Sequence, residues 1–295
     1  MSQTILITGA STGLGYLMAQ ALADDGHNVI ATMRNVTGRN ATPAAELKAH
    51  SDKITVVELD VASQDSVDTA MKQISAQGLQ VDVLINNAGV VHSGLIEAFS
   101  IEELQHEMNV NYFGIARMFK AVLPDMRDRG DGLIITISSL TGRLVFPGFP
   151  TYSASKFAVE AFAEGYRYEL GALSIDSVIV EPGPVKTELL EKSATPADED
   201  LTASYGPMAT MPTEVEGAFS GFMVENADTA ADPMQVVNDV RKLIAMPFGT
   251  RPLRTVSGAD FGVRAFNDAV ESIQADLLEA LGIAHLDPNN DAGKG

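Results

Sequence analysis

A glycine-rich turn near the start of the chain constrains its fold more than any other feature. The apolar run Thr4–Ile7 predicts a buried strand, and residues 8–15, which follow it, read TGASTGLG. A helix is expected over residues 14–25, where apolar side chains recur at helical spacing until Gly26 ends it. A strand that passes through a glycine turn into a helix begins a parallel strand–helix–strand unit.

The turn is suited to hold phosphate. Backbone N–H groups at a helix start have no intrahelical partner and carry the positive end of the helix dipole, so a pyrophosphate can bind there without a cationic side chain. Gly9, Gly13 and Gly15 would supply an unusual backbone angle, a close approach to the ligand and tight helix-on-strand packing. Because the spacing G-x-x-x-G-x-G differs from the G-x-G-x-x-G fingerprint, an ordinary glycine-rich turn stays open as the alternative.

Strand-like and helix-like stretches alternate along most of the chain. Alternation of this kind predicts an α/β fold, a doubly wound parallel sheet (Rossmann fold) with helices on both faces. A length of 295 residues with 45% hydrophobic content is ample for one core, so a single domain is expected over residues 1–295. The further expected strands cover residues 29–32, 54–59, 83–85, 133–137, 177–180 and 253–256, and the further helices 44–50, 66–77, 101–129, 152–171, 232–245 and 261–281.

The pattern becomes irregular after Pro184. Residues 188–231 contain several prolines and short apolar clusters, and are predicted to form a lid over the substrate. Residues 187–240 hold eleven acidic residues and the single base Lys192, which is typical of a solvated acidic surface. The C-terminal extension is expected to end in a frayed tail at residues 287–295.

Composition excludes several classes of function. A net charge of −19 argues against nucleic acid or an anionic membrane as the main partner. The absence of cysteine excludes disulfides and thiolate chemistry, and five scattered histidines predict no metal site. No apolar stretch approaches the length of a membrane span and no secretory signal is visible, so a cytoplasmic location is expected.

Three further motifs follow the ends of predicted strands, where doubly wound sheets bind their ligands. Asn86-Asn87-Ala88-Gly89 ends the fourth strand, Ser138-Ser139 ends the fifth, and Tyr152-Ser-Ala-Ser-Lys156 begins thirteen residues after Ser139. Together with the glycine turn, these motifs over residues 8–187 closely resemble the short-chain dehydrogenase/reductase family. The run YSASKFAVE and the long C-terminus look most like its hydroxysteroid-dehydrogenase-like branch.

Tyr152 and Lys156 are four residues apart on a predicted helix, so they share one face. A neighbouring ammonium favours phenolate and should bring the tyrosine pKa, ordinarily about 10, nearer the operating pH. The resemblance implies that Tyr152 exchanges a proton with the substrate oxygen, that Ser139 hydrogen-bonds that oxygen, and that Lys156 also holds the nicotinamide ribose. Of the two serines, Ser139 best matches the family spacing. Asn111 matches the position that anchors a water in the family's proton relay, and the alternative is an asparagine that satisfies backbone groups at a helix kink.

The second predicted strand indicates which nicotinamide cofactor is bound. NAD enzymes carry an acid at the end of this strand, whereas an arginine accommodates the 2′-phosphate of NADP. Here Met33 stands in the place of the acid and Arg34 follows, so NADP is favoured, and Arg39 is a second candidate for the same phosphate. Asp60 and Val61 resemble the pair that contacts adenine, although Asp60 could equally cap the next helix.

The cofactor site is completed by residues 182–187, PGPVKT, which resemble the family segment that covers the nicotinamide. The predicted cofactor-binding residues are Gly9, Ser11, Thr12, Gly13, Leu14, Gly15, Arg34, Asp60, Val61, Asn87, Ala88, Gly89, Tyr152, Lys156, Pro182, Gly183, Val185 and Thr187.

The predicted substrate wall is apolar and contains few cations, which suits a neutral carbonyl or alcohol. The resemblance therefore implies an NADP(H)-dependent oxidoreductase that interconverts a carbonyl and an alcohol, with a small molecule as its partner and a homodimer or homotetramer as its assembly. A non-catalytic NADP-binding sensor or interaction protein is the alternative. The expected wall consists of Val90, Val91, Leu95, Leu144, Phe146, Phe149, Tyr205, Met208, Met211, Phe219 and Phe222.

Overall fold

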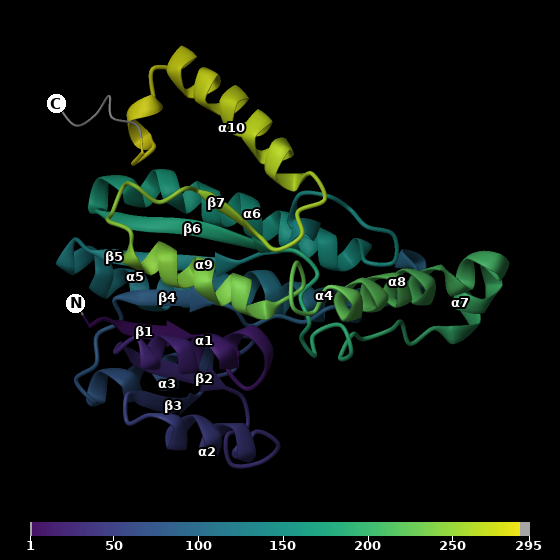
Figure 1. Ribbon diagram of the computed structural model, residues 1–295, viewed down its shortest axis with the longest axis horizontal. Coiled ribbons are helices and arrows are strands. Elements are labelled where there is room, and N and C mark those ends of the chain that lie inside the picture. The colour runs from purple at the N-terminus through teal and green to yellow at the C-terminus, as the bar shows by residue number, and fades with distance from the viewer. Residues whose placement is uncertain (1, 290–295) are drawn as a thin grey trace.

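The computed structural model describes residues 2–289 and shows a parallel sheet between two layers of helices (Figure 1). Within that range seven strands pair in the order β3-β2-β1-β4-β5-β6-β7, and every neighbouring pair is parallel. The predicted doubly wound fold in a single domain is therefore confirmed. The strands are β1 Thr4–Ile7, β2 Asn28–Met33, β3 Ile54–Glu58, β4 Val83–Asn86, β5 Gly132–Ile137, β6 Ile175–Pro182 and β7 Arg254–Ser257.

Each face of the sheet builds its own apolar core. Along β1, Ile5 and Ile7 pack into one core and Leu6 into the other, which explains why this strand is apolar without alternation. The first core holds α1 Gly13–Asp24, α2 Ala41–His50 and α9 Pro233–Ala245. The second holds α3 Gln64–Ala76, α5 Gly114–Arg129 and α6 Pro150–Leu170.

The strand order reverses between β1 and β4. Ile7 of β1 lies in register with Ala31 of β2 on one side and with Ile85 of β4 on the other. The chain that leaves β1 enters α1 on the face of the first core, and the chain that leaves β4 leads to α5 on the face of the second, so a crevice opens between them at the carboxyl ends of the strands. The glycine turn after β1 therefore lies at the edge of this crevice.

The single helix expected over residues 101–129 is interrupted. The structure has α4 Ile101–Met108, a π-helical turn over Asn109–Phe113, and then α5. Ser100 and Glu103 form a capping box that begins α4. The π turn changes the direction of side chains between the two helices without ending the helical path.

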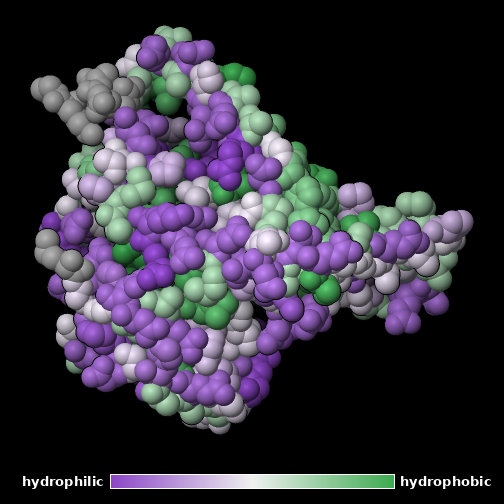
Figure 2. Space-filling view, viewed as in Figure 1, coloured by the Kyte–Doolittle hydropathy of each residue, from purple (hydrophilic) through white to green (hydrophobic). Residues whose placement is uncertain are grey.

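The segment expected to be an irregular lid is largely helical. It contains α7 Glu199–Ser204 and α8 Met211–Glu225, which form an arm that projects from the body (Figure 1). The side chain of Asp198 accepts a hydrogen bond from the Leu201 N–H at the start of α7, and Pro212 lies in the first turn of α8. These residues begin helices, and the prediction of an irregular segment was wrong because proline is accepted at such positions. Apolar side chains gather where the arm joins the body (Figure 2).

The C-terminal part carries α10 Val263–Ala280, and then returns to the body. Asp287 pairs with the Nε of Arg167 at 3.1 Å, and the side chain of Asn289 donates a hydrogen bond of 2.8 Å to the Arg251 carbonyl. The prediction of fraying is therefore wrong for residues 287–289, and residues 290–295 lie outside the described range. Across residues 2–289 no helix combines the length and the apolar character that crossing a membrane requires.

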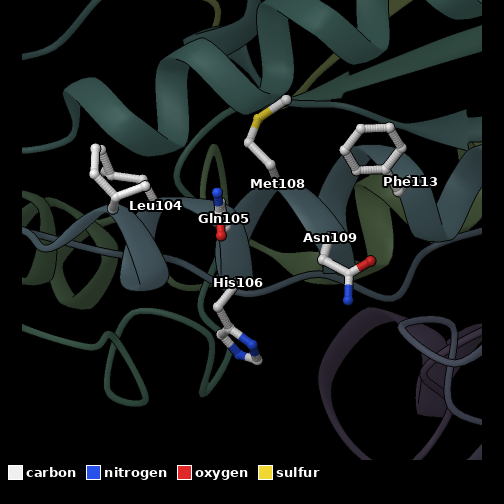
Figure 3. Close-up of a pocket in the computed structure, with 7 residues that line it drawn as sticks. Leu104, Gln105, His106, Met108, Asn109 and Phe113 are labelled. Atoms are coloured by element: carbon white, nitrogen blue, oxygen red, sulfur yellow. The ribbon is translucent and has the colours of Figure 1, made fainter.

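The outer surface of α4 and the π turn carries a depression of about 570 Å³ (Figure 3). Ile101 and Phe113 on its rim are more than half exposed. The homodimer or homotetramer that the family resemblance implies stays a prediction. The depression is lined by Ile101, Leu104, Gln105, His106, Met108, Asn109 and Phe113.

Candidate active site

A cleft of about 520 Å³ follows the carboxyl ends of β1 to β4. It gathers residues that are far apart in the chain, from Gly9 to Lys192, into one wall. The sequence-predicted cofactor residues that line it are Gly9, Ser11, Thr12, Gly13, Leu14, Arg34, Asp60, Val61, Asn87, Ala88, Gly89 and Thr187.

Two glycines of the turn are required by packing. Gly9 has φ +70°, and a Cβ there would lie 2.8 Å from the Cα of Ala88. A Cβ at Gly15 would lie 2.4 Å from the Gly9 carbonyl oxygen and 2.5 Å from the Asn87 side chain. Gly15 therefore lets α1 pack closely against the turn. Among the described residues 2–289, it is not part of the cleft lining.

Hydrogen bonds join the glycine turn to the end of β4. The Thr8 hydroxyl accepts the backbone N–H groups of Asn87 and Ala88 at 3.0 Å each. The Asn87 amide in turn donates to the carbonyls of Thr8 at 2.9 Å and Gly9 at 3.1 Å. These hydrogen bonds hold the glycine turn against the chain that follows β4, and both segments line the cleft.

The residues present fit a dinucleotide. Thr12 is the N-cap of α1, and its hydroxyl accepts none of that helix's N–H groups within the described chain. The first-turn donors therefore face the cleft without a side-chain acceptor, as a bound pyrophosphate requires.

Arg34 follows β2 and lines the same cleft, with its side chain 44% exposed. Its Nη1 lies 3.9 Å from the Asp60 carboxylate, so a screened ion pair leaves the guanidinium available to another anion. Arg39 and Asn40 line the same part of the cleft. Asp60 accepts the N–H of Ala62 at 2.9 Å, whereas Ser63 caps α3, so the alternative assignment of Asp60 as the helix cap was wrong.

A second, apolar cavity of about 170 Å³ adjoins the cleft and shares Leu14, Asn87 and Gly89 with it. The predicted site residues that line this inner pocket are Ser139, Tyr152, Lys156, Pro182, Gly183, Val185 and Thr187. The motifs at the ends of β4, β5 and β6 are thus brought together with the start of α6.

Tyr152 is buried, and its phenol interacts with the side chain of Ser139. Burial raises the tyrosine pKa above its ordinary value, the hydrogen bond with Ser139 opposes this, and the carboxylate of Glu107 raises it further. The expected lowering of this pKa is therefore wrong for this structure, because burial dominates. Ser138 instead interacts with Glu160, so Ser139 is the serine that faces the phenol.

Lys156 is equally buried. Its Nζ donates a hydrogen bond of 2.9 Å to the Ile137 carbonyl and lies 5.7 Å from the centre of the Tyr152 ring. Burial lowers the pKa of Lys156 to about 8, while the carboxylates of Glu160 and Glu107 oppose that change. At neutral pH the ammonium therefore lies beside the phenol.

Asn111 lies in the π turn and is fully engaged. Its Oδ1 accepts the Val90 N–H at 2.9 Å, and its Nδ2 donates to the Val90 carbonyl and to the Ser155 hydroxyl, each at 2.9 Å. This is the geometry of the structural alternative, an asparagine that satisfies backbone groups at a helix irregularity. A role in anchoring water stays a prediction.

The structure adds a buried pair that sequence reasoning missed. Glu107 accepts the N–H of His92 at 3.0 Å, and its second oxygen lies 3.7 Å from the His92 Nδ1. Burial raises the pKa of Glu107 to about 7. The available signal was its position four residues before Asn111, which places both on one helical face.

The apolar wall agrees only partly with the prediction. Tyr205 and Met208 are 39% and 51% exposed between α7 and α8, because the helices carry them out along the arm, so these two assignments are wrong. Phe222 packs against Phe261 at 5.5 Å between ring centres. The inner pocket is lined by the predicted Val90, Val91, Phe146, Phe149 and Phe219, and by Leu140, Leu189, Leu190, Met223 and Phe261, which were not predicted.

Residues 3–198 match the sequence profile of the family described as short chain dehydrogenase. The chain belongs to the short-chain dehydrogenase/reductase family. Retinol dehydrogenase 8 from Bos taurus is 36% identical over 270 residues, which cover 88% of this chain and 86% of the relative. A 3-ketodihydrosphingosine reductase from Bacteroides thetaiotaomicron is 39% identical over 207 residues, 69% of this chain and 73% of that one.

The solved structure of a short-chain dehydrogenase from Streptomyces avermitilis superposes with a TM-score of 0.74 at 31% identity, over 96% of this chain and 98% of that one. This short-chain dehydrogenase/reductase is therefore an oxidoreductase with a Rossmann nucleotide-binding fold. Similar structures contain NADP⁺ in one case and NADH in another, so family membership leaves the choice of cofactor open.

Proposed function

We propose that this protein is an NADP(H)-dependent oxidoreductase that interconverts a carbonyl and a primary or secondary alcohol. The observation that carries the proposal is the convergence of Ser139, Tyr152 and Lys156 in one buried pocket that opens into the phosphate-binding cleft. A hydroxyl donor, a phenol and an ammonium at this point supply a proton and stabilise negative charge on a substrate oxygen.

In reduction, the Tyr152 hydroxyl donates its proton to the carbonyl oxygen, and Ser139 donates a hydrogen bond to the same oxygen. The raised pKa keeps the phenol protonated at neutral pH, which suits this direction. In oxidation the Tyr152 phenol first loses its proton to solvent, the Lys156 ammonium stabilises the resulting phenolate, and the phenolate then takes the proton of the alcohol. A nicotinamide cofactor held by the cleft residues would supply or accept the hydride, which no side chain can provide.

The assignment of NADP is supported by charge at the end of β2. Met33 ends the strand where an acid would bind a ribose 2′-hydroxyl, and the exposed Arg34 follows at the rim of the cleft. A guanidinium pairs with a phosphate through two parallel hydrogen bonds. Arg39 lies on the same rim and adds a second cation.

The lining of the inner pocket supports a neutral, apolar substrate. Phe146, Phe149 and Phe219 form an edge-to-face cluster over the pocket, with ring centres 5.4 and 5.9 Å apart. Retinol, for which one relative is named, is a neutral molecule that combines a single polar end with a long hydrocarbon portion. We therefore assign a substrate of this kind to the apolar pocket.

Turnover tests the proposal. Purified protein with NADPH is screened against long-chain aldehydes, ketones, steroids and quinones by loss of nicotinamide absorbance. We expect Tyr152→Phe to lower kcat about a thousandfold, in the range of general acid–base catalysis, while NADPH binding measured by fluorescence stays intact.

The main rival is a non-catalytic NADP-binding sensor. It would bind NADPH with comparable affinity in the wild type and in Tyr152→Phe, and would turn over no carbonyl in either. That outcome would reject the enzyme and keep the cofactor assignment.

A further inference from the structure

Lys192 is the single base in a strongly acidic stretch of the chain. Residues 187–240 contain eleven acids, and most of them lie on the arm that carries α7 and α8. A dinucleotide bound in the cleft is itself anionic, so this stretch would repel the cofactor that it adjoins. The placement of its only cation is therefore informative.

Lys192 reaches from the start of the arm segment to the glycine turn. Its Nζ lies 3.4 Å from the hydroxyl of Thr12, the N-cap of α1, and also pairs with Glu188 one helical turn earlier. Its side chain is 57% exposed and lines the same cleft as Gly9 and Gly13. The ammonium thus stands beside the N-cap of α1, whose first-turn N–H groups have no side-chain acceptor.

We propose that Lys192 binds the pyrophosphate of the dinucleotide and thereby ties the arm segment to the N-terminus of α1. An ammonium has three donors, so it can bind a phosphate oxygen while it keeps Glu188. The positive end of the α1 dipole and the ammonium then act on one anion from two sides. The inference rests on the proposed function only in requiring that a nicotinamide dinucleotide occupies the cleft.

Calorimetric titration of the whole protein with NADP⁺ and with NAD⁺ tests the placement without any turnover. Since the pyrophosphate is common to both, Lys192→Ala should weaken both by the same factor, about tenfold for one charge-assisted hydrogen bond. Lys192→Arg should keep most of the affinity, and Glu188→Gln should raise it by freeing the ammonium. Arg34→Asp, the matched comparison, should weaken NADP⁺ alone.

Two outcomes of the Lys192→Ala titrations overturn the placement. Equal affinities in Lys192→Ala and wild type would exclude a phosphate contact, and a loss confined to NADP⁺ would move the contact to the 2′-phosphate. Should Arg34→Asp weaken neither cofactor selectively, the NADP assignment fails while the Lys192 result stands. Far-UV circular dichroism and melting temperature establish that every variant is folded.

The rate of limited proteolysis of the arm gives a second measurement. A protease that cleaves after glutamate attacks exposed sites such as Glu199 in α7. NADP⁺ at saturating concentration should slow this cleavage in the wild type and in Lys192→Arg, and should not slow it in Lys192→Ala. Protection that persists in Lys192→Ala would show that the arm is held by other contacts.

Discussion

At the residue scale, the environment of the Tyr152 phenol has opposed effects on its pKa. Burial and Glu107 raise the tyrosine pKa, and the hydrogen bond with Ser139 lowers it. The spacing of Tyr152 and Lys156 predicted their proximity, but it carried no information on how deeply the pair is buried. Burial is a property of the whole pocket, and it reversed the expected direction of the tyrosine pKa.

Glu107 gives a pH-dependent prediction. Its folded pKa of about 7 lies above the ordinary value of 4.5, so stability present at low pH is lost as the pH rises through this interval. Glu107→Gln resembles the protonated form at every pH. The variant should therefore gain stability relative to wild type between pH 4.5 and 7, reaching about 3 kcal/mol, and the gain should level off above that range.

Denaturant unfolding at several pH values measures this difference. Glu169→Gln removes a negative charge from an exposed position on α6 and is the control for net charge. A difference between Glu107→Gln and wild type that does not vary with pH would contradict the assignment of a raised pKa to Glu107.

Individual site residues were predictable where a motif fixes them. The glycine turn, Asn87, Ser139, Tyr152 and Lys156 follow strand ends in a set order, and parallel strands bring such ends together. Lys192 and Glu107 belong to no such motif. Their positions depend on the path of the arm and on the face that α4 buries, which local patterns do not specify.

At the scale of elements, the π turn over Asn109–Phe113 is the main departure from the predicted helices. The Asn111 side chain spans the space between the chain after β4 and α6 through three hydrogen bonds. Hydrophobic periodicity predicts a continuous helix here, because apolar residues recur at helical spacing on both sides of the turn and the helical path does not end there. The helices of the arm were not predicted because proline usually interrupts a helix, whereas Pro212 lies in the first turn of α8.

Asn111→Ala should destabilise the fold by about 3 kcal/mol, because it leaves the buried Val90 backbone groups and the Ser155 hydroxyl without this partner. Thermal melting measures the effect. Ser155→Ala removes one of the three bonds to Asn111 and should cost less. Melting of Asn111→Ala at the wild-type temperature would show that the π turn is held by its backbone alone.

At the scale of the molecule, the parallel sheet with helices on both faces was predictable, because buried parallel strands are apolar throughout and the helices between them are amphipathic. The return of the C-terminus was not. Asp287 reaches Arg167, a side chain only 1% exposed near the end of α6, across 120 positions of sequence. A single ion pair between residues far apart in the chain cannot be detected from the local sequence pattern around either residue.

Asp287→Ala should lower the free energy of unfolding by about 2–3 kcal/mol, because it leaves the Arg167 guanidinium buried without its carboxylate. Asp276→Ala, on the exposed side of α10, removes the same charge and serves as the control. Equal unfolding free energies for the two variants would show that Asp287 contributes no more than a surface charge does.

Residues 188–231, which include the arm, contribute no strand to the sheet that residues 2–289 form. They nevertheless supply Leu189, Leu190, Phe219 and Met223 to the inner pocket. Ser139, Tyr152 and Lys156, to which we assign the proton transfer, are held by the end of β5 and by α6, whereas these four apolar side chains of the pocket come from a separate segment. The proposed chemistry and part of the pocket lining therefore belong to different parts of the chain. Exchanging residues 188–231 between members of the family is a route to new substrates that leaves the strands of the sheet unchanged.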